Sequence, residues 1–300
     1  MKRRGDSIRF LKVSGAGNDF VLLDLTGRAT RKIPAPTRGS LVRALCARGH
    51  SVGADGVLFL ERSPSADFRL MYYNSDGKEA ALCGNGARCA ALYAFEHGIA
   101  PAVMTIQVGS GAVGAVVAKS GVELAMGRPT DFRPDVLVRT ARGAVRGDFV
   151  NTGVPHFVTM PAEWGRLDVS GLGREIRRHP AFGRAGANVN FVRLLRGGSV
   201  EIRTYERGVE AETLACGTGA VAAAVCLAKR GLVRPPVRLS TRGGDVLRVR
   251  FEDSSNPLSM PFLHGPAQVV YEGEIAASTL RAVARRLAHT GSRRHWAPKR

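Results

Sequence analysis

The sequence has 300 residues, of which 44% are hydrophobic and 23% are charged, and its formal net charge at pH 7 is +19. This composition is typical of a globular protein and excludes a wholly disordered chain. No apolar run approaches the roughly 18 residues of a membrane span, and no apolar core follows the basic residues at Met1–Arg4. We therefore expect a cytoplasmic protein, without a secretory signal, whose five cysteines are reduced.

The positive charge favours nucleic-acid binding, because a basic surface attracts phosphate. No recognisable module accompanies the charge: there is no zinc finger, no aromatic RNA-binding motif and no basic helix that leads into heptads. The basic residues are dispersed, except in a tail from Arg281 to Arg300 that contains no acidic residue. Nucleic-acid binding is therefore the alternative from a different class, and a small molecule is the expected partner, with no membrane.

The predicted elements occur twice, in the same order along the chain. The first set comprises a strand at 68–73, an alanine-rich helix between Cys83 and Gly98, and a strand at 103–108. The second set comprises a strand at 200–205, an alanine-rich helix between Cys216 and Gly231, and a strand at 237–241. Each helix is apolar on nearly every side and should be buried, with its closing glycine as a left-handed C-cap.

This repeat predicts an α+β fold of two similar, pseudo-symmetric lobes. Each lobe is expected to be a sheet or barrel wrapped around one central helix, with the active site in the cleft between the lobes. We expect an N-terminal lobe at 1–130, a C-terminal lobe at 131–276 and a basic tail at 277–300. The tail begins with the helical pattern Leu280, Val283 and Leu287, and a disordered end is expected after it.

Cys83 and Cys216 stand at equivalent points of the repeat, each at the start of a Cys-Gly-x-Gly segment just before a helix. The glycines let a ligand approach the backbone, and the unpaired amides of a helix start favour negative charge. We therefore expect each thiol to be shifted toward thiolate and a substrate carboxylate to be held by the amides.

Cys46, Cys89 and Cys226 show no such pairing and are predicted to be structural. Cys46 and His50 lack further metal ligands nearby, so no metal site is expected.

Two thiols that face one carbon from opposite sides can invert a stereocentre, because one removes a proton and the other returns one. Each sulfur would have to approach the carbon to about 3–3.5 Å, which places the two sulfurs on the order of 7 Å apart. The sequence therefore predicts an isomerase that needs no cofactor. Pyridoxal phosphate is not expected, because Lys78, Lys119 and Lys229 have no evident Schiff-base setting.

At these residues the chain resembles the diaminopimelate epimerase family, which interconverts LL- and meso-diaminopimelate without pyridoxal phosphate in lysine and peptidoglycan-precursor biosynthesis. The family's motifs follow in order across roughly residues 8–275. They are Gly15–Phe20, Gly53–Gly56, Asn74–Gly77, Cys83–Cys89, Gly153–His156, Asn188–Phe191, Tyr205–Gly208 and Ala215–Gly219. The resemblance implies a cytoplasmic enzyme, and we expect a homodimer.

Carried to this chain, the resemblance implies that Cys83 and Cys216 are the acid/base thiols and that His156 and Glu206 lie beside them and tune them. The substrate's amino and carboxylate groups would be held by Asn18, Asn74, Asn188, Glu206 and Arg207. The helix-start amides at Gly84, Asn85, Gly217 and Thr218 would hold the reacting carboxylate.

Two positions depart from the family pattern. Val154 stands where members usually carry Asn, and Gly56 stands where some members carry Gln, so the distal end of the substrate could be held differently. The segment from Glu252 to Gly265 is also longer than the usual hairpin. A proline-racemase-like enzyme stays open within the same chemistry, although Leu214-Ala215 replaces the Ser-Pro typical there. A third reading is the related isomerase family that shares the fold but lacks the thiol pair, and the two retained cysteines count against it.

Overall fold

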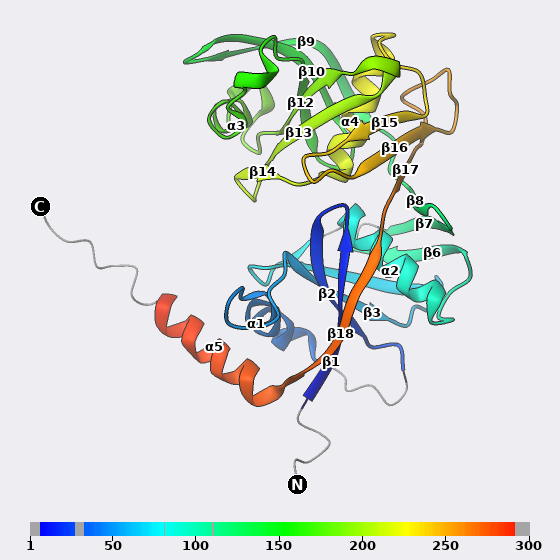
Figure 1. The fold of residues 1–300 in the computed structure, drawn as a ribbon, viewed down its shortest axis with the longest axis vertical. Coiled ribbons are helices and arrows are strands. Elements are labelled where there is room, and N and C mark those ends of the chain that lie inside the picture. The colour runs from blue at the N-terminus through cyan, green and yellow to red at the C-terminus, as the bar shows by residue number, and fades with distance from the viewer. Residues whose placement is uncertain (1–6, 28–32, 81, 110, 292–300) are drawn as a thin grey trace, which may run out of the picture. The chain divides into compact units, whose positions relative to one another are not determined.

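The computed structural model describes residues 7–27, 33–80, 82–109 and 111–291, and the chain divides into two compact units (Figure 1). Unit 1 lies within Met1–Gly114 and Ala267–Arg300, and unit 2 is Ala115–Pro266. The predicted α+β fold with two similar halves is confirmed. The first cut falls after Gly114 and not near residue 130, and residues from Ala267 onward belong to unit 1 because the last strand pairs with the first. The basic N-terminal residues and the final part of the tail lie outside the described residues.

In the described part of unit 1, three helices accompany strands of the sheet. Its strands are β1 (Ser7–Gly15), β2 (Asn18–Asp24), β3 (Gly56–Glu61), β4 (Phe68–Asn74), β5 (Glu79–Ala80), β6 (Val103–Val108) and β18 (Gln268–Ala276). Its helices are α1 (Ala35–Cys46), α2 (Gly84–Glu96) and α5 (Ala277–Gly291). Strand β7 (Gly111–Ala118) runs across the boundary in the chain.

Unit 2 repeats this plan with more strands. Its strands are β8 (Gly121–Ala125), β9 (Thr130–Thr140), β10 (Gly143–Asn151), β11 (Pro155–Thr159), β12 (Asn188–Leu194), β13 (Val200–Glu206), β14 (Ala211–Thr213), β15 (Val237–Ser240), β16 (Val246–Phe251) and β17 (Pro261–Gly265). Its α-helices are α3 (Val169–Arg177) and α4 (Gly217–Lys229), and short 3-10 turns lie at Trp164–Arg166, Pro180–Phe182 and Arg196–Gly198.

The two units share one pattern of strand pairing. In unit 1, β1 pairs antiparallel with β2, β2 parallel with β3, β3 antiparallel with β4, and β4 parallel with β6. In unit 2, β10 pairs antiparallel with β11, β11 parallel with β12, β12 antiparallel with β13, and β13 parallel with β15. The helix that follows each short hairpin strand is α2 in unit 1 and α4 in unit 2, so the internal repeat is a repeat of structure.

Both central helices are buried, as their composition predicts. Alanines line the buried faces of α2 and α4, and every residue from Ala220 to Leu227 has at most 2% of its surface exposed. Each helix ends in a Schellman turn. Gly98 (φ 66°) and Gly231 (φ 69°) take the left-handed conformation, and the amides of Ile99 and Leu232 bond back to carbonyls in the last helical turns.

Helices α1 and α3 are absent from the sequence-based prediction, which gave each lobe one central helix. The sequence of α1 contains Pro36 and Gly39 and has weak periodicity, so burial against β3 rather than local propensity determines it. The predicted tail helix is confirmed as α5, and Leu280 and Val283 pack with α1 in one apolar core. The long segment after Glu252 is a turn between β16 and β17. It is closed by two hydrogen bonds: the backbone N–H of Asp253 donates to the hydroxyl of Ser259, and that hydroxyl donates to the carbonyl of Asp253.

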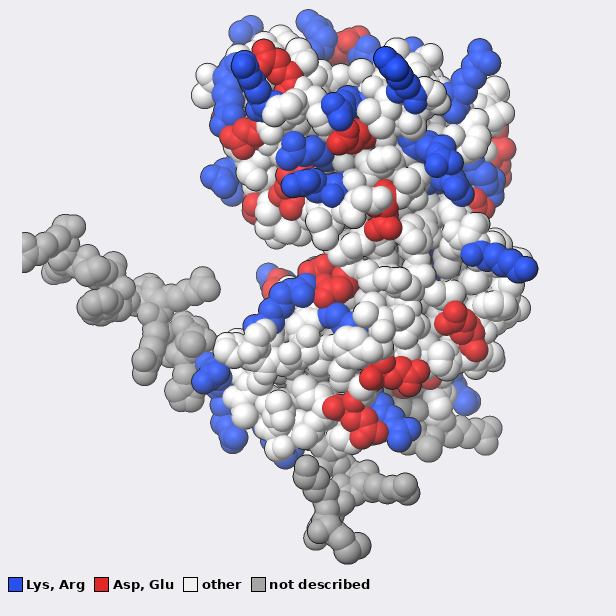
Figure 2. All heavy atoms as spheres, in the orientation of Figure 1, with Lys and Arg blue, Asp and Glu red and all other residues white. Residues whose placement is uncertain are grey.

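Surface charge follows the sequence-based expectation of dispersal. Figure 2 shows Lys and Arg side chains scattered among acidic ones on the visible face of each unit. Many of these arginines form ion pairs with Asp or Glu, for example Arg203 with Glu212 and Arg250 with Glu123. Among the described residues no helix has the length and apolar character needed to cross a bilayer.

Gly56, at the start of β3, has no room for a side chain. A Cβ placed there would lie 2.5 Å from the carbonyl oxygen of Tyr73 and 2.6 Å from the ring of Tyr72. We predict that Gly56→Ala lowers stability by about 1–3 kcal/mol, because the backbone carbonyl cannot move away cheaply. Gly127→Ala, where a Cβ meets nothing within 4 Å, is the matched control. Thermal unfolding that gives the two variants equal midpoints would contradict this prediction.

Candidate active site

Cys83 and Cys216 occupy the same structural position, the N-cap of the central helix in each unit. Their backbone angles are nearly identical, with φ −125° and ψ 113° at Cys83 and φ −125° and ψ 112° at Cys216. Each carbonyl accepts the first helical hydrogen bond, and both side chains are partly exposed. Neither cysteine side chain caps its helix, and the backbone amides of a helix's first turn favour negative charge.

In unit 1, a chain of polar side chains lies beside Cys83. Arg88 donates to the Oδ1 of Asn85 at 2.7 Å, Asn85 donates to Asn18, and Asn18 donates to Asp55 at 3.1 Å. Asn18 opens β2 and Asp55 directly precedes β3, and these two strands are parallel neighbours. The site therefore uses side chains at one end of the sheet together with the first turns of α2.

Asp55 is held in turn by a charged cluster at the same end of the sheet. Arg48 bridges Asp19 and Asp55, and Lys12 forms an ion pair with Asp19 at 2.7 Å. Burial raises the pKa of Asp19, but hydrogen bonds from Arg48 and Lys12 outweigh burial and hold the pKa at about 2. Asp19 is therefore ionised at neutral pH, and Asp55, held by Arg48, accepts the hydrogen bond from Asn18.

Asn74, the last residue of β4, is exposed at the same end of unit 1. The hydroxyl of Tyr72 donates to its Oδ1 at 2.8 Å, and the Tyr72 ring fills the space beside Gly56. A glutamine at position 56 would clash with this ring. The departure at Gly56 is therefore linked to Tyr72, which orients Asn74.

In unit 2, His156 is fully buried at the start of β11. Its Nδ1 lies 3.0 Å from the Nδ2 of Asn190, and that same Nδ2 donates to the carbonyl of Phe157 at 3.2 Å. A carbonyl can only accept, so the amide of Asn190 faces His156 with its NH₂ group, and the ring proton lies on Nε2. Burial, followed by the nearby charge of Arg207, lowers the pKa of His156 to about 3. His156 is therefore a neutral side chain at neutral pH.

Asn188, Glu206 and Arg207 meet at the end of β13. The Oδ1 of Asn188 accepts the backbone N–H of Arg207 at 2.7 Å, and Thr213 donates to the carboxylate of Glu206. Because its oxygen accepts from a backbone donor, the amide of Asn188 is oriented.

Val154, which departs from the family pattern, lies in the turn before β11. In the same turn Thr152 donates to the carbonyl of Thr218 at 3.0 Å, so this departure also lies close to the first turn of α4.

The surroundings of Cys216 oppose its ionisation. Burial raises the pKa of Cys216 well above the usual value, and the negative charge of Glu206, to which the thiol is hydrogen-bonded, raises it further. Contacts with Thr218, at 3.5 Å, and the amide of Gly219 act in the opposite direction but do not compensate. The expectation of a thiolate at both helix starts is therefore wrong for Cys216, because desolvation and Glu206 outweigh the helix amides.

The predicted site residues thus form two clusters, one in each unit. Unit 1 brings together Asn18, Asn74, Cys83, Gly84 and Asn85, and unit 2 brings together His156, Asn188, Glu206, Arg207, Cys216, Gly217 and Thr218. The interpretation of the sequence missed the residues that orient them, which are Arg48, Asp55, Tyr72, Arg88, Asn190, Thr204 and Thr213. Asp55, Arg88 and Asn190 lie inside motifs that the sequence analysis recognised, so the sequence could have indicated them as candidates. Only the structure shows which side chains they contact.

The other cysteines are buried in the apolar interior. Burial raises the pKa of Cys46 and of Cys89 to about 12 each and that of Cys226 well above its usual value. Among the residues that the structure describes, no three His, Cys, Asp or Glu side chains are grouped closely enough to hold a metal ion.

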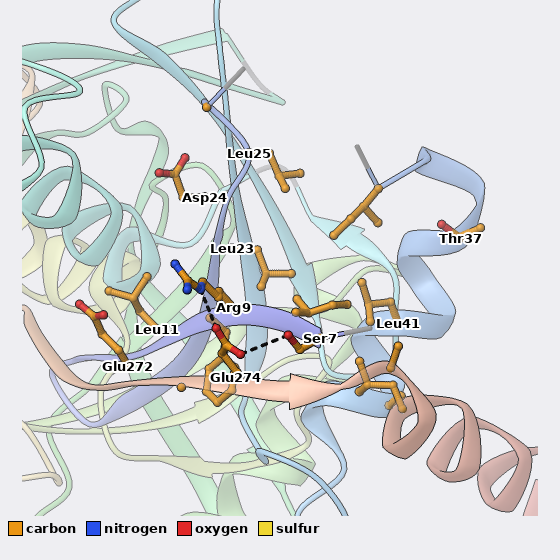
Figure 3. A pocket seen from close by; sticks show the side chains of 18 of the residues that line it. Ser7, Arg9, Leu11, Leu23, Asp24, Leu25, Thr37, Leu41, Glu272 and Glu274 are labelled. Carbon is orange, nitrogen blue, oxygen red and sulfur yellow. Dashed lines mark hydrogen bonds and ion pairs between the residues drawn. The ribbon is translucent and has the colours of Figure 1, made fainter. Parts of the chain in front are cut away.

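A cavity of about 1490 Å³ lies in unit 1, between β1, β18, α1 and α5 (Figure 3). Its walls are largely apolar, and Asp24, Glu272 and the ion pair of Arg9 with Glu274 line it. Tyr93 and His97, in the last turn of α2, also line it, whereas Cys83 heads the first turn of that helix. The cavity contains none of the predicted site residues.

Comparison with known proteins agrees with this geometry. The family model described as diaminopimelate epimerase matches residues 10–131 and 149–270. The chain is 39% identical over 280 residues to the diaminopimelate epimerase of Aquifex aeolicus, covering 91% of this chain and 99% of that one. It is 41% identical to the diaminopimelate epimerase of Gemmatimonas aurantiaca, over 89% of this chain and 99% of that one.

Solved structures show the same fold at greater distance. A probable proline racemase from Agrobacterium radiobacter aligns with a TM-score of 0.68 at 20% identity, covering 90% of this chain and 93% of that one. The chain therefore shares the fold of that structure, and its curated relatives make it an isomerase of the epimerase class. More specifically, the chain belongs to the diaminopimelate epimerase family.

The hydrogen bond between Cys216 and Glu206 predicts how the thiol reacts with alkylating agents. Glu206→Gln removes the negative charge that raises the pKa of Cys216, so the pKa falls and the thiolate fraction at pH 8 rises. We expect faster iodoacetamide labelling of the Cys216 peptide by mass spectrometry. The Cys83 peptide, in the other unit, is the internal control. Unchanged labelling of Cys216 would show that Glu206 does not control its ionisation.

The buried neutral His156 predicts a pH dependence of stability. Its pKa falls from 6.5 to about 3 on folding, so the stability that it contributes is complete above pH 6.5 and is lost as the pH falls toward 3. The loss is up to about 1.4 kcal/mol per pH unit. His156→Phe should flatten the decline of the free energy of unfolding between pH 7 and 5, measured by urea denaturation. Asp19 titrates below this window. Equal slopes for wild type and variant would refute the assignment.

Proposed function

We propose that this protein is a diaminopimelate epimerase that interconverts the LL and meso forms by proton transfer between the substrate α-carbon and two thiols, without a cofactor. Membership of the family over most of the chain supports the substrate. The observation that carries the mechanism is the duplicated helix start, with Cys83 and Cys216 at equivalent N-caps beside oriented donors. An enzyme that inverts a carbon needs two acid/base groups, and the repeat supplies one from each unit.

In the proposed step, a thiolate removes the α-proton, so that a C–H bond breaks and an S–H bond forms. The electron pair left on carbon is delocalised into the carboxylate, whose oxygens are held by the helix-start amides of Gly84–Asn85 and Gly217–Thr218. The second thiol then gives its proton to the opposite face of the carbon and becomes a thiolate. No oxidation or reduction occurs, and the reverse reaction exchanges the two roles.

The electrostatics of unit 2 assign the starting roles. Burial and Glu206 keep Cys216 protonated, so Cys216 is the acid and Cys83 the base in a turnover that starts from this state. We propose that the carboxylate of Glu206 receives a substrate ammonium group, and that Arg207, Asn188 and Asn74 hold the carboxylate at the distal end. His156, being neutral, positions groups by hydrogen bonding and supplies no charge.

The cellular setting is proposed from the sequence and the family. We place the reaction in lysine and peptidoglycan-precursor biosynthesis, in the cytoplasm, and expect the protein to form a homodimer. Light scattering during gel filtration checks the oligomeric state: a mass of one chain would contradict the dimer.

The two-thiol mechanism predicts that either cysteine is indispensable. Cys83→Ala and Cys216→Ala should each lower kcat by at least about 10²–10⁴-fold, because each removes one general acid/base group. Epimerisation of LL-diaminopimelate is followed by chromatographic resolution of the stereoisomers, with proline as a control substrate. Cys89→Ala in α2 and Cys226→Ala in α4 are matched controls, since both are buried inside the same helices, and they should retain activity. Near-wild-type turnover in either helix-start variant would contradict the mechanism.

A further inference from the structure

Arg88 is a fully buried arginine in the central helix of unit 1. It stands five residues after Cys83, and the position five residues after Cys216 is Val221, which is equally buried in α4. The two helices have the same fold and the same N-cap geometry, so packing at this position is compatible with an apolar side chain. A buried guanidinium carries a large desolvation cost. Its presence in unit 1 alone therefore indicates a role that packing does not explain.

The hydrogen bonds of Arg88 reveal that role. A guanidinium only donates, so the atom of Asn85 that it contacts at 2.7 Å must be the carbonyl Oδ1. Asn85 therefore turns its NH₂ group toward Asn18 and donates to the Oδ1 of Asn18. Asn18 in turn donates to Asp55, whose carboxylate only accepts. An obligate donor at one end and an obligate acceptor at the other give this chain of amides a single direction.

This direction determines what Asn18 can offer to a ligand. Its oxygen accepts from Asn85 and one N–H is bonded to Asp55, so its second N–H is the donor that it can offer to a ligand. An N–H group needs an acceptor. At neutral pH the two ammonium groups of diaminopimelate only donate, whereas its two carboxylates only accept.

We propose that Arg88 is a positioning residue that fixes the direction of the hydrogen-bond chain through Asn85 and Asn18 to Asp55, so that Asn18 presents an N–H group to a substrate carboxylate. The inference rests on the proposed function for the identity of the substrate. Without Arg88, only Asp55 at the far end still holds this direction. The amides of Asn85 and Asn18 are then less firmly oriented, and Asn18 offers its N–H group to the carboxylate in fewer of the molecules.

Three substitutions at position 88 test the inference. Arg88→Val copies the second repeat and removes the donor. Arg88→Lys keeps an obligate donor, and Arg88→Gln keeps a polar side chain whose amide can donate or accept. Arg88→Val should raise KM for LL-diaminopimelate by about tenfold, the equivalent of one good hydrogen bond, with a smaller change in kcat. Arg88→Lys should retain a lower KM than Arg88→Gln. A KM for Arg88→Gln equal to or below that of Arg88→Lys would overturn the inference, and so would an unchanged KM for Arg88→Val.

A second readout does not depend on activity. In wild-type protein labelled with ¹⁵N-asparagine, NMR should show one set of side-chain NH₂ signals each for Asn18 and Asn85. Arg88→Val should shift or double both sets, while the signals of Asn188 and Asn190 in unit 2 stay in place. Unchanged Asn18 and Asn85 signals would overturn the inference even if the enzyme lost activity. Conversely, an inactive wild type with the expected NMR changes would overturn the proposed substrate and leave the direction of the chain supported. If Arg88→Val does not fold, KM and the NMR signals of Asn18 and Asn85 are compared between Arg88→Lys and Arg88→Gln.

Discussion

The geometry of a helix start, fixed by the strands around it, is the constraint on which the site depends. The same order of strand pairings surrounds α2 and α4, and it places a cysteine at each N-cap with nearly identical backbone angles. Close packing keeps the first turns in place: a Cβ at Gly86 would lie 2.8 Å from Leu58, and one at Gly219 would lie 2.3 Å from Asn190. These are the same contact in the two units, made by an apolar side chain in one and by an amide in the other.

The two repeats also differ in which of their structural elements carry polar side chains. Phe20 and His156 stand at equivalent points of the parallel strand pairs, each opposite the first residue of the next strand. In unit 1 the polar chain runs through the helix, from Arg88 to Asn85 and out to Asp55. In unit 2 it runs beneath the helix, from Thr204 to Asn190 and His156.

One fold therefore surrounds its two thiols with different charges: a buried cation lies in the helix of Cys83, and a carboxylate is hydrogen-bonded to Cys216. A two-base reaction requires such a difference, because one sulfur must hold a proton while the other accepts one.

The repeat, the buried central helices, their glycine caps and the paired cysteines could all be predicted from the sequence, because each depends on local pattern. Helix α1 could not, because burial against distant strands stabilises a segment of weak periodicity. Helix α3 was missed although its sequence is amphipathic and Asp168 caps its first turn. The return of β18 to pair with β1 is likewise a contact between the two ends of the chain, and no local pattern marks it. Among the site residues, Asn18, Asn85, Asn188 and Glu206 were recognisable by motif, but their orienting partners are distant in sequence. The ionisation of Cys216 was mispredicted because the helix start is visible in the sequence, whereas desolvation and the contact with Glu206 are not.

The central claim is that two thiols with unequal proton affinity act on one carbon, and isotope entry during turnover tests it most directly. LL-diaminopimelate is incubated with the enzyme in deuterium oxide, without added cofactor, and both stereoisomers are analysed by mass spectrometry at low conversion. Because the proton that enters comes from a different sulfur than the one that leaves, each meso molecule should carry one deuterium while the recovered LL form carries almost none. Protium retained in the meso product, or equal deuterium in both forms from the earliest times, would contradict the account.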